Sequence, residues 1–177
     1  MISVSSRLFG TLNLNSMARG DFHPYDTRGA GGPISTRYRV EGDTDATIVA
    51  GEMLRVDQGS SDTEYVQLEV DGGSNTTVKI GVAASDSDED SSPSTDGNVW
   101  AYDNPLYLFK GRATTASNLA ASVRLTQVTM DVAAGTNGRM TIDEDDTTNG
   151  TYRIFDFDAT TGTVVFALAM ADSIIEG

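Results

Sequence analysis

Polar and apolar side chains alternate in the stretch Tyr65-Val66-Gln67-Leu68-Glu69-Val70, and this alternation is the main evidence for the fold class. A period of two is typical of a β-strand with its three apolar residues on one face and its polar residues on the other. The turn sequence Asp71-Gly72-Gly73 follows, and residues 78–82 repeat the same period. The chain is therefore predicted to turn from one strand directly into the next.

The same pattern continues along most of the chain. Further strands are predicted at residues 99–102, 106–110, 123–132, 139–143, 151–158 and 163–170. Asn137-Gly138 and Asn149-Gly150 supply residues that tolerate the positive φ of tight hairpin turns, so the chain after Val123 is expected to be an antiparallel meander. The apolar parity switches within residues 123–132, which predicts a β-bulge near Thr126-Gln127.

Helix has little place in this pattern. Only Ala113 to Ala121 could form a helix, and that helix would be short. The prediction is an all-β fold, built as an antiparallel barrel or a sandwich and preceded by an extended N-terminal arm.

Charge divides the chain into two parts. Residues 1–40 hold five arginines against two aspartates, a charge of +3, whereas residues 41–177 hold 24 acids against seven bases, a charge of −17. The first part has no sustained period and includes the glycine-rich stretch 28–33. We therefore expect an extended basic arm over 1–40 and an acidic β-barrel body over 41–177.

The excess of acidic over basic residues indicates the kind of organism that the protein comes from and excludes some classes of partner. The whole chain carries 26 acids against 12 bases, and only two of the bases are lysines. Such a surface favours a halophilic origin, since salt near 1 M shortens the Debye length to about 3 Å; an acidic protein of an ordinary organism is the alternative. Phosphates would be repelled, and no apolar run reaches the roughly 20 residues that span a bilayer. Neither nucleic acid nor membrane is expected as a partner.

Catalytic chemistry finds little support. Cysteine is absent, which removes disulfides, thiolate nucleophiles and cysteine metal sites. The sole histidine, His23, falls in the arm, where a general base would lack rigid support. Asp156 and Asp158 stand two apart on one predicted strand, as glycosidase carboxylates can, although two solvated acids are the commoner case. We expect no enzyme activity and no cofactor.

An acidic loop at residues 86–98 is the stronger of two places with metal-ligand chemistry, and Asp143 to Asp146 is the weaker one. Asp86, Asp88 and Asp90 are the Ca²⁺ candidates, because Ca²⁺ prefers oxygen ligands. The EF-hand spacing fails, since Ser91 stands at its sixth position and Gly97 at its twelfth. A solvated loop is the favoured alternative.

Two stretches of the chain carry a resemblance to a known family. They are Ile48-Val49-Ala50-Gly51-Glu52-Met53-Leu54-Arg55-Val56 and Lys79-Ile80-Gly81-Val82-Ala83, and Thr- and Gly-rich hairpins follow them. Together they resemble the capsid decoration or cement proteins of tailed viruses. The resemblance implies a small β-barrel or β-tulip body and a homotrimer on the outer capsid surface that clamps subunits of the major capsid protein. With the halophilic bias, it implies a virus of a salt-loving archaeon. The acidic loop at 86–98 and the long arm depart from the smaller members of that family.

Two other interpretations stay open. One is a tail, baseplate or fibre component of a virion. The other is a carbohydrate-binding β-sandwich module, for which Trp100 and Tyr102, on one face of a predicted strand, are the aromatic candidates.

The arm is expected to supply the partner interface, because arginines pair with carboxylates and aromatic residues act as anchors. The predicted interface residues are Arg7, Leu8, Phe9, Arg19, Phe22, Tyr25, Arg28, Arg37 and Arg39. In the alternative, the arm folds back on its own body as an extra strand.

Overall fold

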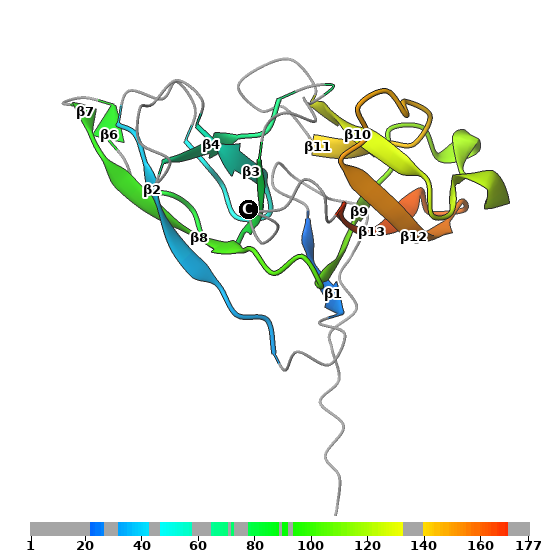
Figure 1. The fold of residues 1–177 in the computed structure, drawn as a ribbon, viewed down its shortest axis with the longest axis horizontal. Coiled ribbons are helices and arrows are strands. Elements are labelled where there is room, and N and C mark those ends of the chain that lie inside the picture. The colour runs from blue at the N-terminus through cyan, green and yellow to red at the C-terminus, as the bar shows by residue number, and fades with distance from the viewer. Residues whose placement is uncertain are drawn as a thin grey trace, which may run out of the picture.

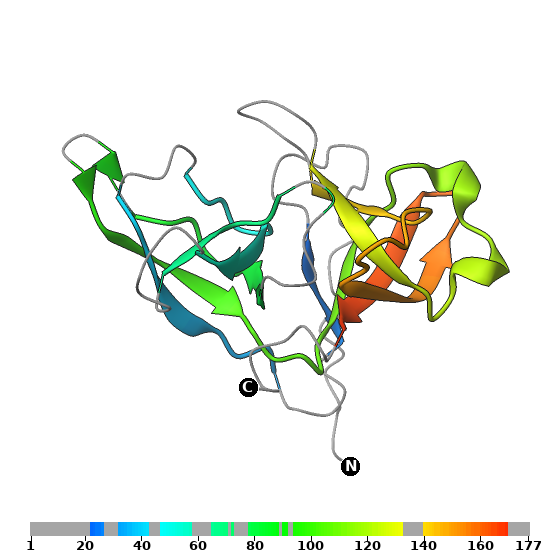
Figure 2. The same ribbon diagram turned by 45° about the horizontal axis from the view of Figure 1, so that its top comes forward.

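The computed structural model describes residues 22–26, 32–42, 47–57, 65–70, 72, 78–88, 90–91, 94–132 and 140–169. They form two antiparallel sheets, seen as two lobes in Figures 1 and 2. In this part of the chain no helix is both long and apolar enough to cross a membrane.

One sheet has six strands and the other has five. The order in the six-stranded sheet is β1 (His23–Asp26), β9 (Leu108–Arg112), β13 (Thr163–Leu168), β12 (Tyr152–Asp158), β10 (Gln127–Val132) and β11 (Met140–Asp143). The order in the five-stranded sheet is β2 (Thr36–Val40), β8 (Gly97–Tyr102), β5 (Lys79–Ala83), β3 (Met53–Val56) and β4 (Val66–Leu68). A small hairpin of β6 (Asp90–Ser91) and β7 (Ser94–Thr95) extends the acidic loop.

The predicted all-β antiparallel fold is confirmed, and its architecture is consistent with a β-sandwich. Neither sheet closes into a barrel within the described residues. Both nevertheless curl, because an isolated bridge joins Arg39 of edge strand β2 to Tyr65 beside β4, and another joins Ala113 after β9 to Ile142 of β11. The strong twist of short strands brings these segments together without forming a full ladder.

β10 begins later than the strand predicted from residue 123. The 3₁₀ turn η2 (Ala116–Asn118) lies within the predicted short helical stretch, and a second 3₁₀ turn, η3 (Ala121–Val123), begins at its last residue. Leu125 then takes a positive φ of 61°, and β10 begins at Gln127. The predicted bulge near Thr126-Gln127 is confirmed at Leu125-Thr126: the Leu125 N–H donates to the Ile154 carbonyl and the Ile154 N–H donates to the Thr126 carbonyl, so two residues oppose one.

Asn149 takes the expected positive φ, 59°, but Gly150 does not. The predicted meander is wrong at this connection, because β12 pairs with β10 and not with β11, which precedes it in the chain.

Part of the predicted arm lies in the sheets. β1 pairs with β9, and β2 pairs with β8 along all five of its residues. Phe22, directly before β1, is 3% exposed and stacks edge-on against Phe166 with ring centroids 5.1 Å apart. Gly111 makes room for it, since a β-carbon there would collide with the Phe22 ring. Residues 1–21 lie outside the described part of the chain.

The apolar cores of the two sheets are continuous. Met53 of β3 and Val82 of β5 belong to the same buried cluster as Phe109, Ile154 and Phe166 of the six-stranded sheet. A second cluster fills the five-stranded sheet. Gly81, at a φ of 148°, lets β5 approach β8, because a β-carbon there would overlap the Tyr102 carbonyl.

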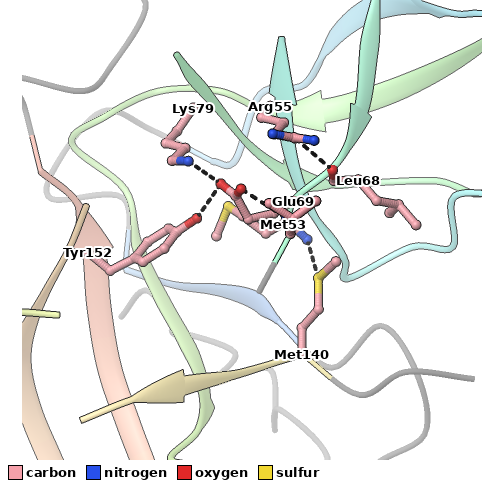
Figure 3. A network of polar contacts seen from close by, with 8 residues as sticks. Met53, Arg55, Leu68, Glu69, Lys79, Met140 and Tyr152 are labelled. Carbon is pink, nitrogen blue, oxygen red and sulfur yellow. Dashed lines mark hydrogen bonds and ion pairs between the residues drawn. The ribbon is translucent and has the colours of Figure 1, made fainter. Parts of the chain in front are cut away.

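A buried polar network joins the sheets at this junction (Figure 3). Lys79 Nζ of β5 lies 2.5 Å from Glu69 Oε2, and both side chains are fully buried. Tyr152 of β12 donates its hydroxyl to the same carboxylate oxygen at 3.0 Å. Burial, followed by the charge of Glu69, raises the pKa of Tyr152 well above its usual range, so the phenol stays a neutral donor. A charged pair removed from water requires such complete hydrogen bonding.

Glu69 reaches this position because the alternation of residues 65–70 ends early. β4 stops at Leu68, and the Glu69 N–H donates to the Met53 carbonyl at 2.9 Å. Glu69 is 2% exposed and Val70 is 42% exposed, the reverse of what the period of two predicts for these two positions.

We predict that Lys79→Met lowers the free energy of unfolding by about 3 to 5 kcal/mol, because Glu69 stays buried without its cation. The double variant Lys79→Met/Glu69→Leu removes both charges and should recover a large part of that loss. Urea titrations of the three proteins measure this. A single variant within about 0.5 kcal/mol of the parent, the range of surface substitutions, would show that the pair is not buried.

Candidate functional site

The outer face of β2 and β8 is the candidate site, as a binding surface. Arg37 of β2 stands directly opposite Trp100 of β8. Both side chains are exposed, Trp100 at 47%. Side chains opposite one another in an antiparallel pair have their β-carbons about 5 Å apart, so the two side chains leave the same face of the sheet as neighbours.

The inner face of the same strands is packed and holds this surface rigidly. Val99 and Ala101, which flank Trp100, are both fully buried. The backbone N–H of Trp100 donates to Ser85 Oγ at 3.2 Å, and its backbone carbonyl accepts the Ala84 N–H at 2.6 Å. Trp100 is thus displayed on a fixed strand.

Tyr38 attaches β2 to the segment that follows β8. Its hydroxyl donates to Asp103 Oδ2 at 2.7 Å, just beyond the end of β8. Burial, and then the hydrogen bond to Asp103, raise the pKa of Tyr38 above its usual range. The phenol therefore remains a donor, and β2 stays attached at the end nearer Ile34.

Arg39 closes the other end of β2 with a polar cluster. Its guanidinium bonds Asp96 Oδ2 at 2.9 Å and lies 4.4 Å from the centroid of the Tyr65 ring. The Tyr65 hydroxyl donates to the same oxygen, and this hydrogen bond contributes most to lowering the pKa of Asp96. The cluster supports the surface, because Asp96 directly precedes β8.

The predicted interface residues fall into three groups. Arg7, Leu8, Phe9, Arg19 and Arg28 lie outside the described residues. Phe22 is buried in the core, whereas Tyr25 is exposed on β1. Arg37 and Arg39 share β2, beside Trp100.

The two aromatic candidates of β8 differ in exposure. Trp100 is open, but Tyr102 is only partly exposed and packs against the core that the two sheets share. A period of two could identify Trp100, but it gave no sign that Arg37 would face it.

The acidic loop uses its carboxylates internally. Asp86 Oδ1 accepts the Ala50 N–H at 2.8 Å, and Asp88 Oδ1 accepts the Asn98 N–H at 2.5 Å. The side chain of Asp90 lies outside what the structure describes. Throughout the described segments, no group of three or more potential metal-ligating side chains is assembled.

The remaining sequence candidates lie on the six-stranded sheet. His23 begins β1, opposite Lys110 of β9. Asp156 Oδ1 pairs with Arg124 Nη2 at 2.7 Å, and Asp158 Oδ1 accepts the Thr160 N–H at 2.9 Å. Both carboxylates are exposed and engaged in bonds of this kind.

A carboxyl pair stands at the end of β11. Partial burial, and then a hydrogen bond and charge repulsion from Asp145, raise the pKa of Asp143 to about 6. Asp145 Oδ2 also accepts the Asn118 side-chain amide at 2.8 Å. Two carboxylates that share a proton in this way resist joint ionisation.

Comparisons with protein-family models, with curated proteins and with solved structures found no match for this chain.

We predict that Asp143→Asn stabilises the protein above pH 6 and has little effect near pH 4. The folded pKa of Asp143 is raised, so its contribution is present when it is protonated and is lost as the pH rises through about 6. Asparagine keeps the uncharged form at every pH. Thermal melts at pH 4 and pH 7 provide the measurement.

Asp146→Asn is the matched control in the same loop. The Thr148 N–H is the first cause that lowers the pKa of Asp146, so this variant should be destabilised at pH 7. Equal effects of the two substitutions at pH 7 would contradict the assignment.

Proposed function

We propose that the protein is a non-enzymatic structural protein of a virion, which decorates the outer capsid surface and stabilises the shell by binding the major capsid protein, as a homotrimer. The observation that carries the proposal is the Arg37–Trp100 pair, exposed on two packed strands. Tryptophan and arginine are among the residues that dominate the binding energy of protein interfaces. A rigid sheet that presents both is suited to attachment.

The charge around the pair favours a specific partner over general adhesion. Residues 41–107, which supply most of the five-stranded sheet, carry 15 acids against two bases. One of those bases, Lys79, is buried in its ion pair. Arg37 is thus a cation on an acidic lobe, and a partner must offer an acceptor at that one point while tolerating negative charge around it.

The stretches that resemble decoration proteins support the same interpretation. Residues 53–56 and 79–83 form β3 and β5, which pair directly with each other. They lie at the centre of the sheet whose edge carries Arg37. The resemblance is therefore borne by the scaffold of the candidate surface.

Binding to capsid shells tests the proposal. A major capsid protein is expected from a gene beside that of this chain, and shells assembled from it should bind the purified protein. Trp100→Ala and Arg37→Glu should each cost about 1 to 2 kcal/mol of binding free energy. Cosedimentation over a concentration series gives the affinity.

Arg153→Glu is the matched control, since Arg153 is an exposed arginine of β12 in the other sheet. It changes the net charge by the same amount as Arg37→Glu and should leave binding unchanged. Failure of the parent protein to bind shells, or equal losses in both charge reversals, would contradict the proposal. Density on the tail instead of the shell in particle images would favour a tail, baseplate or fibre component.

A further inference from the structure

We propose that the outer face of the six-stranded sheet binds one unit of a neutral saccharide. The site is a hollow of about 190 Å³ between β1, β9, β12 and β13. Its principal lining residues are Tyr25, Lys110, Asp156, Asp158, Thr163 and Val165. Capsid attachment is proposed for the other sheet, so the two surfaces are separate.

The strand register sets the width of the hollow. Lys110 is opposite Val165, and Val165 is opposite Asp156. Neighbouring strands lie about 4.8 Å apart, so roughly 10 Å separates the backbones that carry the amine and the carboxylate. Val165, 9% exposed, forms an apolar floor between them. The distance suits one sugar ring with hydrogen-bonding groups at both sides.

Thr163 and Asp158 form the next cross-strand pair and add polar groups along one side. The Thr163 hydroxyl lies 2.9 Å from that of Thr161. Hydrogen bonds from Thr161 and Thr160 lower the pKa of Asp158, which keeps its carboxylate ionised as an acceptor. Hydroxyls that both donate and accept are suited to the hydroxyls of a sugar.

Tyr25 supplies an aromatic wall. Its side chain is 59% exposed, and Lys110 Nζ lies 5.9 Å from the ring centroid. An aromatic ring with a polar tip offers flat apolar area for the C–H face of a sugar and a hydroxyl for its rim.

Charge balance selects a neutral ligand. Lys110 lines the hollow with Asp156 and Asp158, and Arg124, which is not a lining residue, pairs with Asp156 Oδ1 at 2.7 Å. The cations Lys110 and Arg124 thus offset the two anions. An anionic or cationic ligand would meet a like charge in the hollow, whereas a polyhydroxyl ligand would not. The volume lies below the about 300 Å³ typical of drug-sized ligands, which limits the site to one ring.

A glycan array of neutral and anionic saccharides, probed with the full chain, is the test. We expect hits among the neutral saccharides. For the strongest hit, titration calorimetry should show at least about tenfold weaker binding for Tyr25→Ala and for Lys110→Met. The second variant changes β9 and leaves the sequence of β1 unchanged. Tyr25→Phe keeps the ring and should retain most of the affinity, and Arg153→Ala, outside the hollow, should not change it.

Three results would overturn the proposal. They are an array without neutral hits, binding confined to anionic saccharides, and a neutral hit whose affinity is unchanged by Tyr25→Ala and Lys110→Met. Loss of binding on Trp100→Ala with both of those variants unaffected would place the sugar on the five-stranded sheet instead. Because capsid binding is measured on shells with other variants, failure of one proposal leaves the other intact.

Discussion

The carboxylate of Glu69 is the point on which the two sheets depend. One of its oxygens receives both Lys79 Nζ from the five-stranded sheet and the Tyr152 hydroxyl from the six-stranded sheet. Removing either partner from this buried carboxylate would lower the stability of the fold considerably, because only complete pairing offsets the free-energy cost of desolvating a charge. The polar network therefore specifies how the sheets meet, while the apolar contacts of Met53 and Val82 supply most of the buried area around it.

This junction leaves the outer face of each sheet for separate work. On the five-stranded sheet, Val99 and Ala101 face the core, so Trp100 must face outward. On the six-stranded sheet, Phe166 faces the core, so Val165 lies under the hollow that Tyr25 borders. Both surfaces arise because successive side chains of a strand point to opposite faces of the sheet, and the inner side chains pack in the core. Tyr25 and Arg37 reach them because β1 and β2 are edge strands of different sheets.

The sequence was sufficient for the type of element and for most strand positions, because alternating apolar residues and turn residues are local signals. It failed where a distant partner decides. Glu69 looks like an outward residue of its strand, and its partner Tyr152 lies 83 positions away. Thr36 to Val40 reads as polar arm, yet β8 pairs with it along its length. Trp100 could be identified as an exposed aromatic, but its neighbour Arg37 required the register between two segments that no local pattern relates.

A double-mutant cycle between Glu69→Gln and Tyr152→Phe tests the junction most directly, since the two residues belong to different sheets and share one hydrogen bond. The free energies of unfolding of the parent, both single variants and the double variant give the coupling energy. The structure predicts a favourable coupling of about 0.5 to 3 kcal/mol, as for residues in one buried network. Additive effects, with a coupling indistinguishable from zero, would show that Glu69 and Tyr152 do not meet and that the sheets are not joined in this way.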